Sequence, residues 1–159
     1  MRTIILSLML IVAPLVVVAD EPSMPEFRAP PQKYTHQHEI SRVGSPSPDT
    51  VVDELLIGDV TEKELKYYFY LIGTNGHICG GSGIAIAENG SYYYTEKTFT
   101  TKFESKDGKL NSWKEPVECR LRIQFDSNHA SLHDEGNYCQ RSHCGTRAGI
   151  GNVRFSRAK

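Results

Sequence analysis

Apolar and polar residues alternate most regularly between Cys119 and Phe125. Every second residue of this stretch is a cysteine or a large apolar residue, and the residues between them are arginine or glutamine. This period of two is typical of a β-strand that buries one face. The run 65–72 is rich in aromatic and aliphatic residues, which also favour strands. Both runs predict a β-sheet.

Turn signals divide the rest of the domain into short strands. An Asn-Gly pair, which is a strong hairpin signal, follows the run 65–72, and another follows the glycine-containing run 78–87. Shorter strands are expected at 91–95, 98–103, 130–133 and 149–155. The window 51–57 leaves a helix as an alternative. The sequence therefore predicts an all-β fold, a small antiparallel barrel or sandwich of six to eight strands.

Composition divides the 159-residue chain into three segments. Residues 1–19 combine Arg2 with an apolar run and small residues before Asp20, the pattern of a secretory signal peptide. The apolar run is shorter than the roughly 20 residues of a spanning helix, so no membrane span is expected after cleavage. Residues 20–50 hold six of the eight prolines, which predicts a flexible leader, either a spacer or a tail without a function. Residues 51–159 form the predicted β domain.

Four cysteines in an exported chain predict two disulfides that stabilise a small domain. More than one connectivity is possible for Cys79, Cys119, Cys139 and Cys144. The close spacing of the last two favours a Cys139–Cys144 bond. The predicted strands that carry Cys79 and Cys119 favour a second bond between those two residues. No Cys-x-x-Cys motif is present, so a zinc site is not expected.

Charge is unevenly distributed along the chain, although the net charge is only -1. This near-neutral total argues against a protein that coats nucleic acid. Residues 20–119 hold 10 basic and 16 acidic residues, a net charge of -6, and residues 120–159 hold 7 basic and 3 acidic residues, a net charge of +4. Such an asymmetry can orient a charged partner if folding keeps the two parts apart.

No set of residues indicates a reaction, and the chain is not expected to be an enzyme. The stretch 77–82 is similar to a strand of trypsin-like serine proteases, but the nucleophile and base motifs of those enzymes do not occur. The adjacent Asp134 and Glu135 could serve as acid and base, although a predicted turn leaves both in solvent. We therefore predict no catalytic, cofactor-binding or metal-ligating residue.

Histidines are the remaining candidates for chemistry. His129 and His133 are four residues apart and would share one side of a strand, where His77 or His143 could complete a metal site. The turn residues that flank this pair instead indicate strand ends in solvent. The two histidines of the leader lack a rigid frame, which makes them a poor catalytic pair.

The segment around the last two cysteines is the strongest candidate for recognition. A tight loop at 139–144 would hold Arg141 and His143, and the nearby Arg147, in a rigid exposed position. Such a loop loses little conformational entropy when it binds. The alternative is that the disulfide of this loop has only a structural role and fixes the last strand to the domain.

Three motifs together give the chain a family resemblance. They are His77-x-Cys79, the alternating strand 119–125, and Cys-x4-Cys-Gly-x-Arg-Ala at 139–148. In this spacing the chain resembles small exported bacterial envelope domains that are loosely similar to periplasmic lysozyme-inhibitor families. Ser82 and Gly83 match the start of the Ser-Gly-x-x-Tyr element of membrane-bound lysozyme inhibitors, but Ile86 stands in place of the tyrosine. No inhibitory residue is carried over for this reason.

The resemblance and the predicted export imply a periplasmic or secreted binding module of the bacterial envelope. Its expected partner is a protein, and the candidate is a cell-wall lytic enzyme such as lysozyme, which it would inhibit. The alternatives are an immunity protein or a structural envelope protein without inhibitor activity, and a His-dependent metal-binding protein. No cofactor and no nucleic-acid partner are expected.

Overall fold

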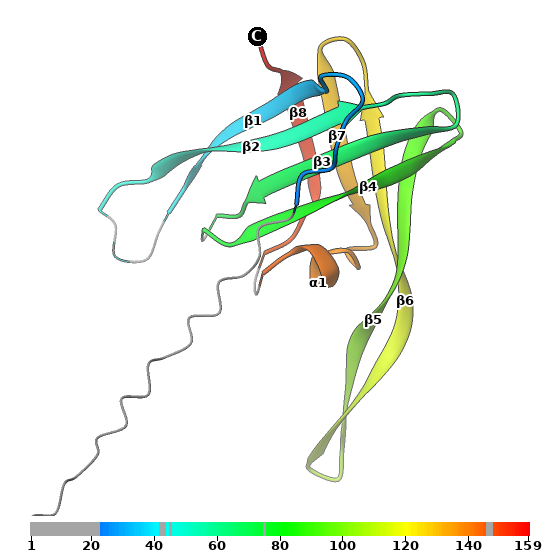
Figure 1. Ribbon diagram of the computed structural model, residues 1–159. Helices are drawn as coiled ribbons and strands as arrows, with labels where there is room; N and C mark the ends of the chain where they lie inside the picture. The colour runs from blue at the N-terminus through cyan, green and yellow to red at the C-terminus, as the bar shows by residue number, and fades with distance from the viewer. Residues whose placement is uncertain (1–22, 42–43, 45, 75, 146–147) are drawn as a thin grey trace, which may run out of the picture.

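The computed structural model describes residues 23–41, 44, 46–74, 76–145 and 148–159. The predicted signal peptide, residues 1–19, lies outside the described residues. Figure 1 labels the elements along the chain. They are β1 (Gln32–Ile40), β2 (Asp49–Gly58), β3 (Glu64–Ile72), β4 (Ile78–Glu88), β5 (Ser91–Lys106), β6 (Lys109–Phe125), β7 (His129–Glu135), α1 (Gln140–His143) and β8 (Asn152–Arg157).

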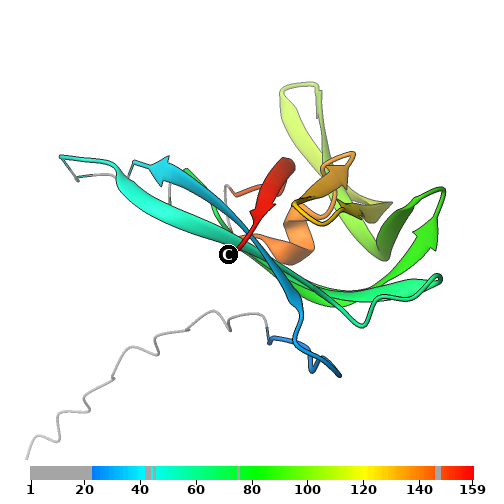
Figure 2. The ribbon, with the colours of Figure 1, turned by 90° about the horizontal axis from the view of Figure 1, so that it is seen from above.

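Each strand pairs antiparallel with the next, and β8 returns to pair with β1, so the sheet closes into a barrel in the order β1 to β8. This confirms the prediction of an all-β fold with two disulfides, and of its two architectures the barrel is the observed one. The window 51–57 lies in β2 and is not helical. Figure 2 shows how the strands curve around the interior. Closure satisfies the backbone groups that an open sheet would leave at its edges.

The barrel interior is filled by alternating side chains. On β6, Cys119, Leu121 and Ile123 are fully buried, as their period of two predicts. The other buried members of the core cluster come from all the strands but β5. The segment between β7 and β8 adds further members. Leu65, Tyr67, Phe69 and Leu71 supply the β3 part of it. An eight-stranded barrel has an interior about wide enough to be filled in this way.

The strands expected at 91–95 and 98–103 form one continuous strand, β5, which pairs with β6 from Tyr92↔Ile123 to Lys106↔Lys109. The turn between β5 and β6 places Asp107 and Gly108 at φ values of 53° and 72°, a left-handed conformation that Asp-Gly adopts at low cost. Residues 97–118 of this hairpin pair only with each other among the described residues. We call them the arm, and Figure 1 shows the arm projecting away from the barrel.

The prediction of a flexible leader at residues 20–50 is wrong for much of that segment. Gln32–Ile40 forms β1, an integral strand of the barrel, because no proline interrupts this stretch and Tyr34 and Ile40 are buried. The segment before it is also held against the barrel. The backbone N–H of Arg28 donates a hydrogen bond to Asp59 Oδ1 at 3.0 Å. The ring of Phe27 lies so close to Gly58 that a Cβ there would come within 2.5 Å of it.

The predicted disulfide pairing is also wrong, although the prediction of two bonds is confirmed. The bonds are Cys79–Cys144 and Cys119–Cys139. The helical turn α1 separates Cys139 from Cys144, so that each cysteine reaches a different strand. Cys144 forms a β-bridge with Cys79, and the N–H of Gly145 donates to the carbonyl of Ile78 at 2.9 Å. Two disulfides are consistent with an oxidising location outside the cytoplasm.

Among the described residues, no helix has the length and apolar character needed to cross a membrane.

Candidate functional site

One cluster of titratable side chains lies on β1 and β2, where β1 continues beyond its pairing with β8. His36 and His38 occupy alternate positions of β1, on the face that also carries the buried Tyr34 and Ile40. Asp53 lies on β2 directly opposite His36 in the strand register. Asp53 Oδ2 is 3.1 Å from His36 Nδ1 and 3.2 Å from His38 Nε2. We call these three residues the mouth triad.

The mouth triad is rigid on one side and open on the other. Asp53 is buried, and its second oxygen, Oδ1, accepts a hydrogen bond of 2.7 Å from the backbone N–H of Ile72. A hollow of about 270 Å³ opens over the triad. Its other walls are Leu71–Thr74 on one side and Ala148–Ile150 and Val153 on the other. The expectation that the leader histidines lack a rigid frame is therefore wrong, because paired strands hold both of them.

A second cluster lies at α1 and is mostly covered, with the Glu96 side chain 27% exposed. His143 Nε2 is 3.2 Å from Glu96 Oε1, and the hydroxyl of Tyr94 donates a hydrogen bond of 2.9 Å to Glu96 Oε2. The His143 ring contacts the rings of Phe69 and Tyr94. Its Nδ1 would lie 2.6 Å from a Cβ at Gly81, so only glycine leaves room for it. We call Tyr94, Glu96 and His143 the sealed cluster.

Burial changes the acidity of the tyrosines around the sealed cluster. Desolvation, together with the hydrogen bond to Glu96 and its negative charge, raises the pKa of Tyr94 to about 12. Desolvation also raises the pKa of Tyr67, whose ring meets that of Tyr94 at a centroid distance of 5.7 Å. Both hydroxyls therefore remain neutral well above physiological pH.

The predicted recognition residues do not share one exposed loop. The His143 side chain is only 10% exposed and belongs to the sealed cluster. Arg141 is exposed, and its guanidinium donates to Thr101 Oγ1 at 3.2 Å. The Ser142 hydroxyl lies 3.3 Å from Thr98 Oγ1. Helix α1 thus braces the base of the arm. Arg147 lies outside the described residues.

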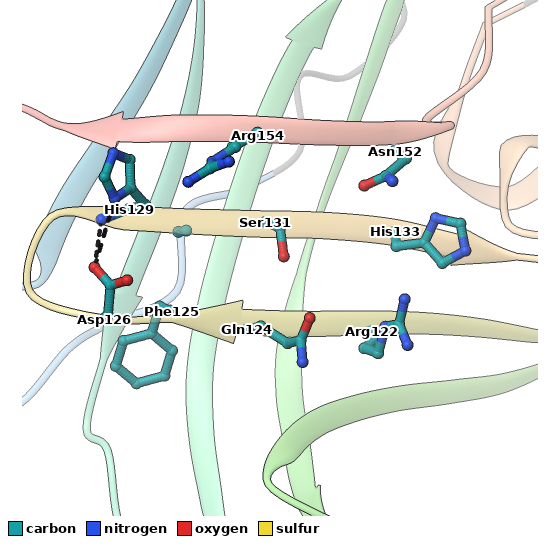
Figure 3. A pocket seen from close by; sticks show the side chains of 10 residues that line it. Arg122, Gln124, Phe125, Asp126, His129, Ser131, His133, Asn152 and Arg154 are labelled. Atoms are coloured by element: carbon teal, nitrogen blue, oxygen red, sulfur yellow. Dashed lines mark hydrogen bonds and ion pairs between the residues drawn. The ribbon is translucent and has the colours of Figure 1, made fainter.

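The outer face of β6, β7 and β8 carries a shallow polar hollow of about 470 Å³, shown in Figure 3. The strand register aligns Arg122, His133 and Asn152 in one row across it. A second row brings Ser131 next to Arg154. We call this surface the basic face. Here the basic C-terminal part of the sequence places two arginines and two histidines, His129 included, on one side of the barrel.

The other sequence candidates are divided between this face and the interior. His129 stands at one end of the basic face, 3.8 Å from Asp126, with its side chain 45% exposed. The turn predicted for Asp134 is wrong, because Asp134 lies within β7 and is buried. Its carboxylate accepts from the N–H of Cys139, and desolvation raises its pKa. Glu135 points outward and lies 3.4 Å from Arg120.

The arm exposes large apolar side chains that the sequence analysis did not single out. Phe99, Phe103, Leu110 and Trp113 are between 41% and 71% exposed. The register puts the first three on one face of the arm, while Trp113 lies opposite Lys102 on the other. Two features of the sequence could have indicated the arm, namely the alternation after residue 97 and the Asp-Gly turn. Pro116 and the polar residues around it obscured the second strand.

The fold and these sites define an eight-stranded up-and-down barrel with a disulfide-bound helical turn and a projecting hairpin. Comparisons of the chain with protein-family models, curated proteins and solved structures find no match. The functional argument therefore depends on the geometry of the sites.

Proposed function

We propose that the protein is an exported binding module of the bacterial envelope and that it captures a protein partner with its arm. The candidate partner is a cell-wall lytic enzyme such as lysozyme, which the bound arm would inhibit. The observation that carries the proposal is the presence of four large, exposed apolar side chains on one projecting hairpin. A few anchor residues supply most of the binding energy at protein interfaces, and tryptophan is enriched among them. Phenylalanine is enriched in the core of interfaces.

The brace under the arm supports the same proposal. A two-stranded hairpin is only marginally stable in isolation. Contacts from Arg141 and Ser142 to the base of the arm limit its movement relative to the barrel. The disulfides at both ends of α1 hold the brace in place. A pre-organised arm loses less conformational entropy on binding, which favours affinity.

Charge and compartment fit a partner of this class. Residues 20–96, before the arm, hold 5 basic and 12 acidic residues, a net charge of -7, whereas the arm itself holds 5 basic and 4 acidic residues, a net charge of +1. The part of the chain that precedes the arm, rather than the arm, would therefore attract a basic enzyme. The signal-peptide pattern and the two disulfides support export to the periplasm or to the medium. Lytic enzymes of the cell wall act in these compartments, so the two proteins would meet there.

The test is an inhibition and binding assay with a panel of lysozymes and purified peptidoglycan hydrolases. We expect the mature protein to bind at least one of them and to slow its lysis of cell walls at micromolar concentration. Phe103→Ser, in which a side chain 64% exposed on the arm is changed, should weaken this binding by about tenfold or more.

The matched control is Ile86→Ser, because Ile86 is 56% exposed on β4, outside the arm. It should leave binding unchanged. Equal losses in both variants, or the absence of binding and inhibition across the panel, would reject the arm as the binding surface. Binding without inhibition would favour the immunity or structural alternative.

A further inference from the structure

We propose that the mouth triad is a binding site for a divalent transition-metal ion, with zinc as the best fit. The ligand atoms would be His36 Nδ1, His38 Nε2 and Asp53 Oδ2. This inference departs from the sequence analysis, which predicted no metal site. It is independent of the proposed function, because the triad and the arm share no residue.

The first argument is the spacing of the ligand atoms. Zinc binds imidazole nitrogen and carboxylate oxygen at about 2.0–2.2 Å in tetrahedral geometry, which places neighbouring ligand atoms about 3.3 Å apart. The two measured separations from Asp53 Oδ2, 3.1 Å and 3.2 Å, agree with this value. All three atoms lie within 4.8 Å of one another. The two imidazole rings are stacked with their centroids 5.0 Å apart, so their side chains would rotate to bring the three atoms around one ion.

The second argument is the hydrogen bonding of the triad. His38 Nε2 is buried and has no hydrogen-bond partner among the described residues, although it faces the carboxylate of Asp53. A buried nitrogen without a partner is costly. His36 Nδ1 shares a hydrogen bond of 3.1 Å with Asp53 Oδ2. An ion located between the three side chains would replace this bond and would also use His38 Nε2.

The third argument is the support behind the ligands. Residues two apart on a strand point to the same side, so β1 directs both imidazoles toward Asp53. The N–H of Ile72 holds Asp53 Oδ1 and leaves Oδ2 directed at the histidines. Hydrogen bonds of this kind orient a ligand and are important for metal affinity.

The hollow over the triad indicates the type of site. Its volume of about 270 Å³ leaves room for water or a small anion as a further ligand. Three protein ligands with an open position are typical of sites that exchange ligands, whereas structural zinc sites are closed by four. We therefore expect an ion that can bind an exchangeable external ligand.

The other histidine clusters lack a full set of ligands. His143 Nε2 and Glu96 Oε1 are likewise buried without a hydrogen-bond partner among the described residues, so this feature alone does not distinguish the triad. Cys119 lies near Glu96 and His143, but its sulfur is bonded to Cys139 and offers no thiolate. At the basic face, the carboxylate of Asp126 already accepts hydrogen bonds from the backbone N–H of His129 and of the residue before it. The mouth triad is the better candidate among the described clusters.

The experiment uses tag-free mature protein, treated with a chelator and then titrated with zinc chloride against a chromogenic zinc indicator. We expect one equivalent of zinc to bind with a dissociation constant in the micromolar range or below. His36→Ala/His38→Ala should weaken binding by more than about 100-fold. Asp53→Asn, which keeps an oxygen for the N–H of Ile72, should weaken it by at least about tenfold.

The matched control is His129→Ala/His133→Ala, which removes two histidines from the basic face and should leave the affinity unchanged. Disulfide mapping and circular dichroism establish that each variant is folded. Copper or nickel that displaces zinc and depends on the same three residues would support the site, since many N/O sites prefer these ions. Zinc affinity that is equal in the triad variants and the wild type, or no stoichiometric binding, would overturn the proposal.

The arm variant Phe103→Ser separates this inference from the proposed function. It should bind zinc like the wild type even where it no longer binds a lytic enzyme. A protein that binds zinc but no hydrolase would retain the metal site and reject the arm proposal. Hydrolase binding without zinc binding would do the opposite.

Discussion

The mouth triad and the sealed cluster are built from similar residues but differ in their surroundings. Each brings an imidazole nitrogen to 3.1–3.2 Å from a carboxylate oxygen. The triad opens into a hollow of about 270 Å³, whereas aromatic rings and α1 cover the sealed cluster. The same chemical groups are therefore accessible to a ligand at one place and serve packing at the other. Environment, rather than residue type, distinguishes a candidate site from a structural contact.

The carboxylates of the two clusters, Glu96 and Asp53, also differ in their contacts. Glu96 Oε2 accepts a hydrogen bond from the Tyr94 hydroxyl, and Glu96 Oε1 faces a single imidazole, that of His143, at 3.2 Å. Asp53 has one oxygen fixed by a backbone N–H, and the other faces two imidazoles at once. Changes in the sealed cluster should therefore affect folding stability, and changes in the triad should affect ligand binding.

The largest effect is expected from the disulfide that fixes the end of α1. Cys79→Ala/Cys144→Ala removes a bond between residues 65 apart in the sequence. In the chain-entropy model this should lower the free energy of unfolding by about 4 kcal/mol. Cys119→Ala/Cys139→Ala opens a separation of only 20 residues and should cost about 3 kcal/mol. Urea unfolding of both variants measures the difference, and the reverse order would contradict this explanation.

A smaller loss is expected when the imidazole of the sealed cluster is removed. His143→Ala should reduce the free energy of unfolding by about 2 kcal/mol, because it leaves a cavity beside Phe69 and leaves the buried Oε1 atom of Glu96 without its imidazole. His129→Ala, at a side chain 45% exposed, is the control and should change stability by less than about 0.5 kcal/mol. Similar values for both would show that the cluster is not structural. Zinc affinity should be unaffected in either variant.

The sealed cluster should also make stability depend on alkaline pH. The folded pKa of Tyr94, about 12, exceeds the ordinary value of 10.0, so the folded state favours the neutral hydroxyl. The resulting stability is fully present below pH 10 and is lost as pH rises toward 12. Tyr94→Phe should flatten the fall in melting temperature over this window. Burial also raises the pKa of Tyr67, so part of the fall should remain. An unchanged pH profile would exclude Tyr94 as a source.

The smallest change in stability is expected at the mouth triad. The His36 side chain is 41% exposed, so His36→Ala should cost less than about 1 kcal/mol in the metal-free protein. Thermal unfolding with and without added zinc measures this. The wild type should gain melting temperature with zinc, and the variant should gain little. A large loss without metal would remove the distinction between the two clusters.

The strand pattern was predictable where burial alternates along the chain. The pattern at 119–125 identified part of β6, and the aromatic run at 65–72 identified β3, because local sequence decides which face is apolar. The leader concealed β1 for a physical reason. Two of its inward positions hold His36 and His38 in place of apolar residues, and prolines on both sides suggested an extended segment.

Contacts between distant residues could not be read in the same way. Sequence spacing brought Cys139 and Cys144 together, but the intervening helical turn separates them. The mouth triad depends on the register of β1 against β2, which pairs His36 with Asp53. That register is a property of the folded sheet. The histidines were visible in the sequence, whereas their shared carboxylate was not.

The pairing of β1 with β8 has a consequence for the order of the strands along the chain. Thr35 and Ser156 are partners across this seam, so the first and last strands of the barrel are neighbours. A short linker from Lys159 to the start of β1 would join them. Opening the chain at the Asp107–Gly108 turn would then create new ends at the tip of the arm. The barrel is therefore suited to circular permutation, with every strand pair retained.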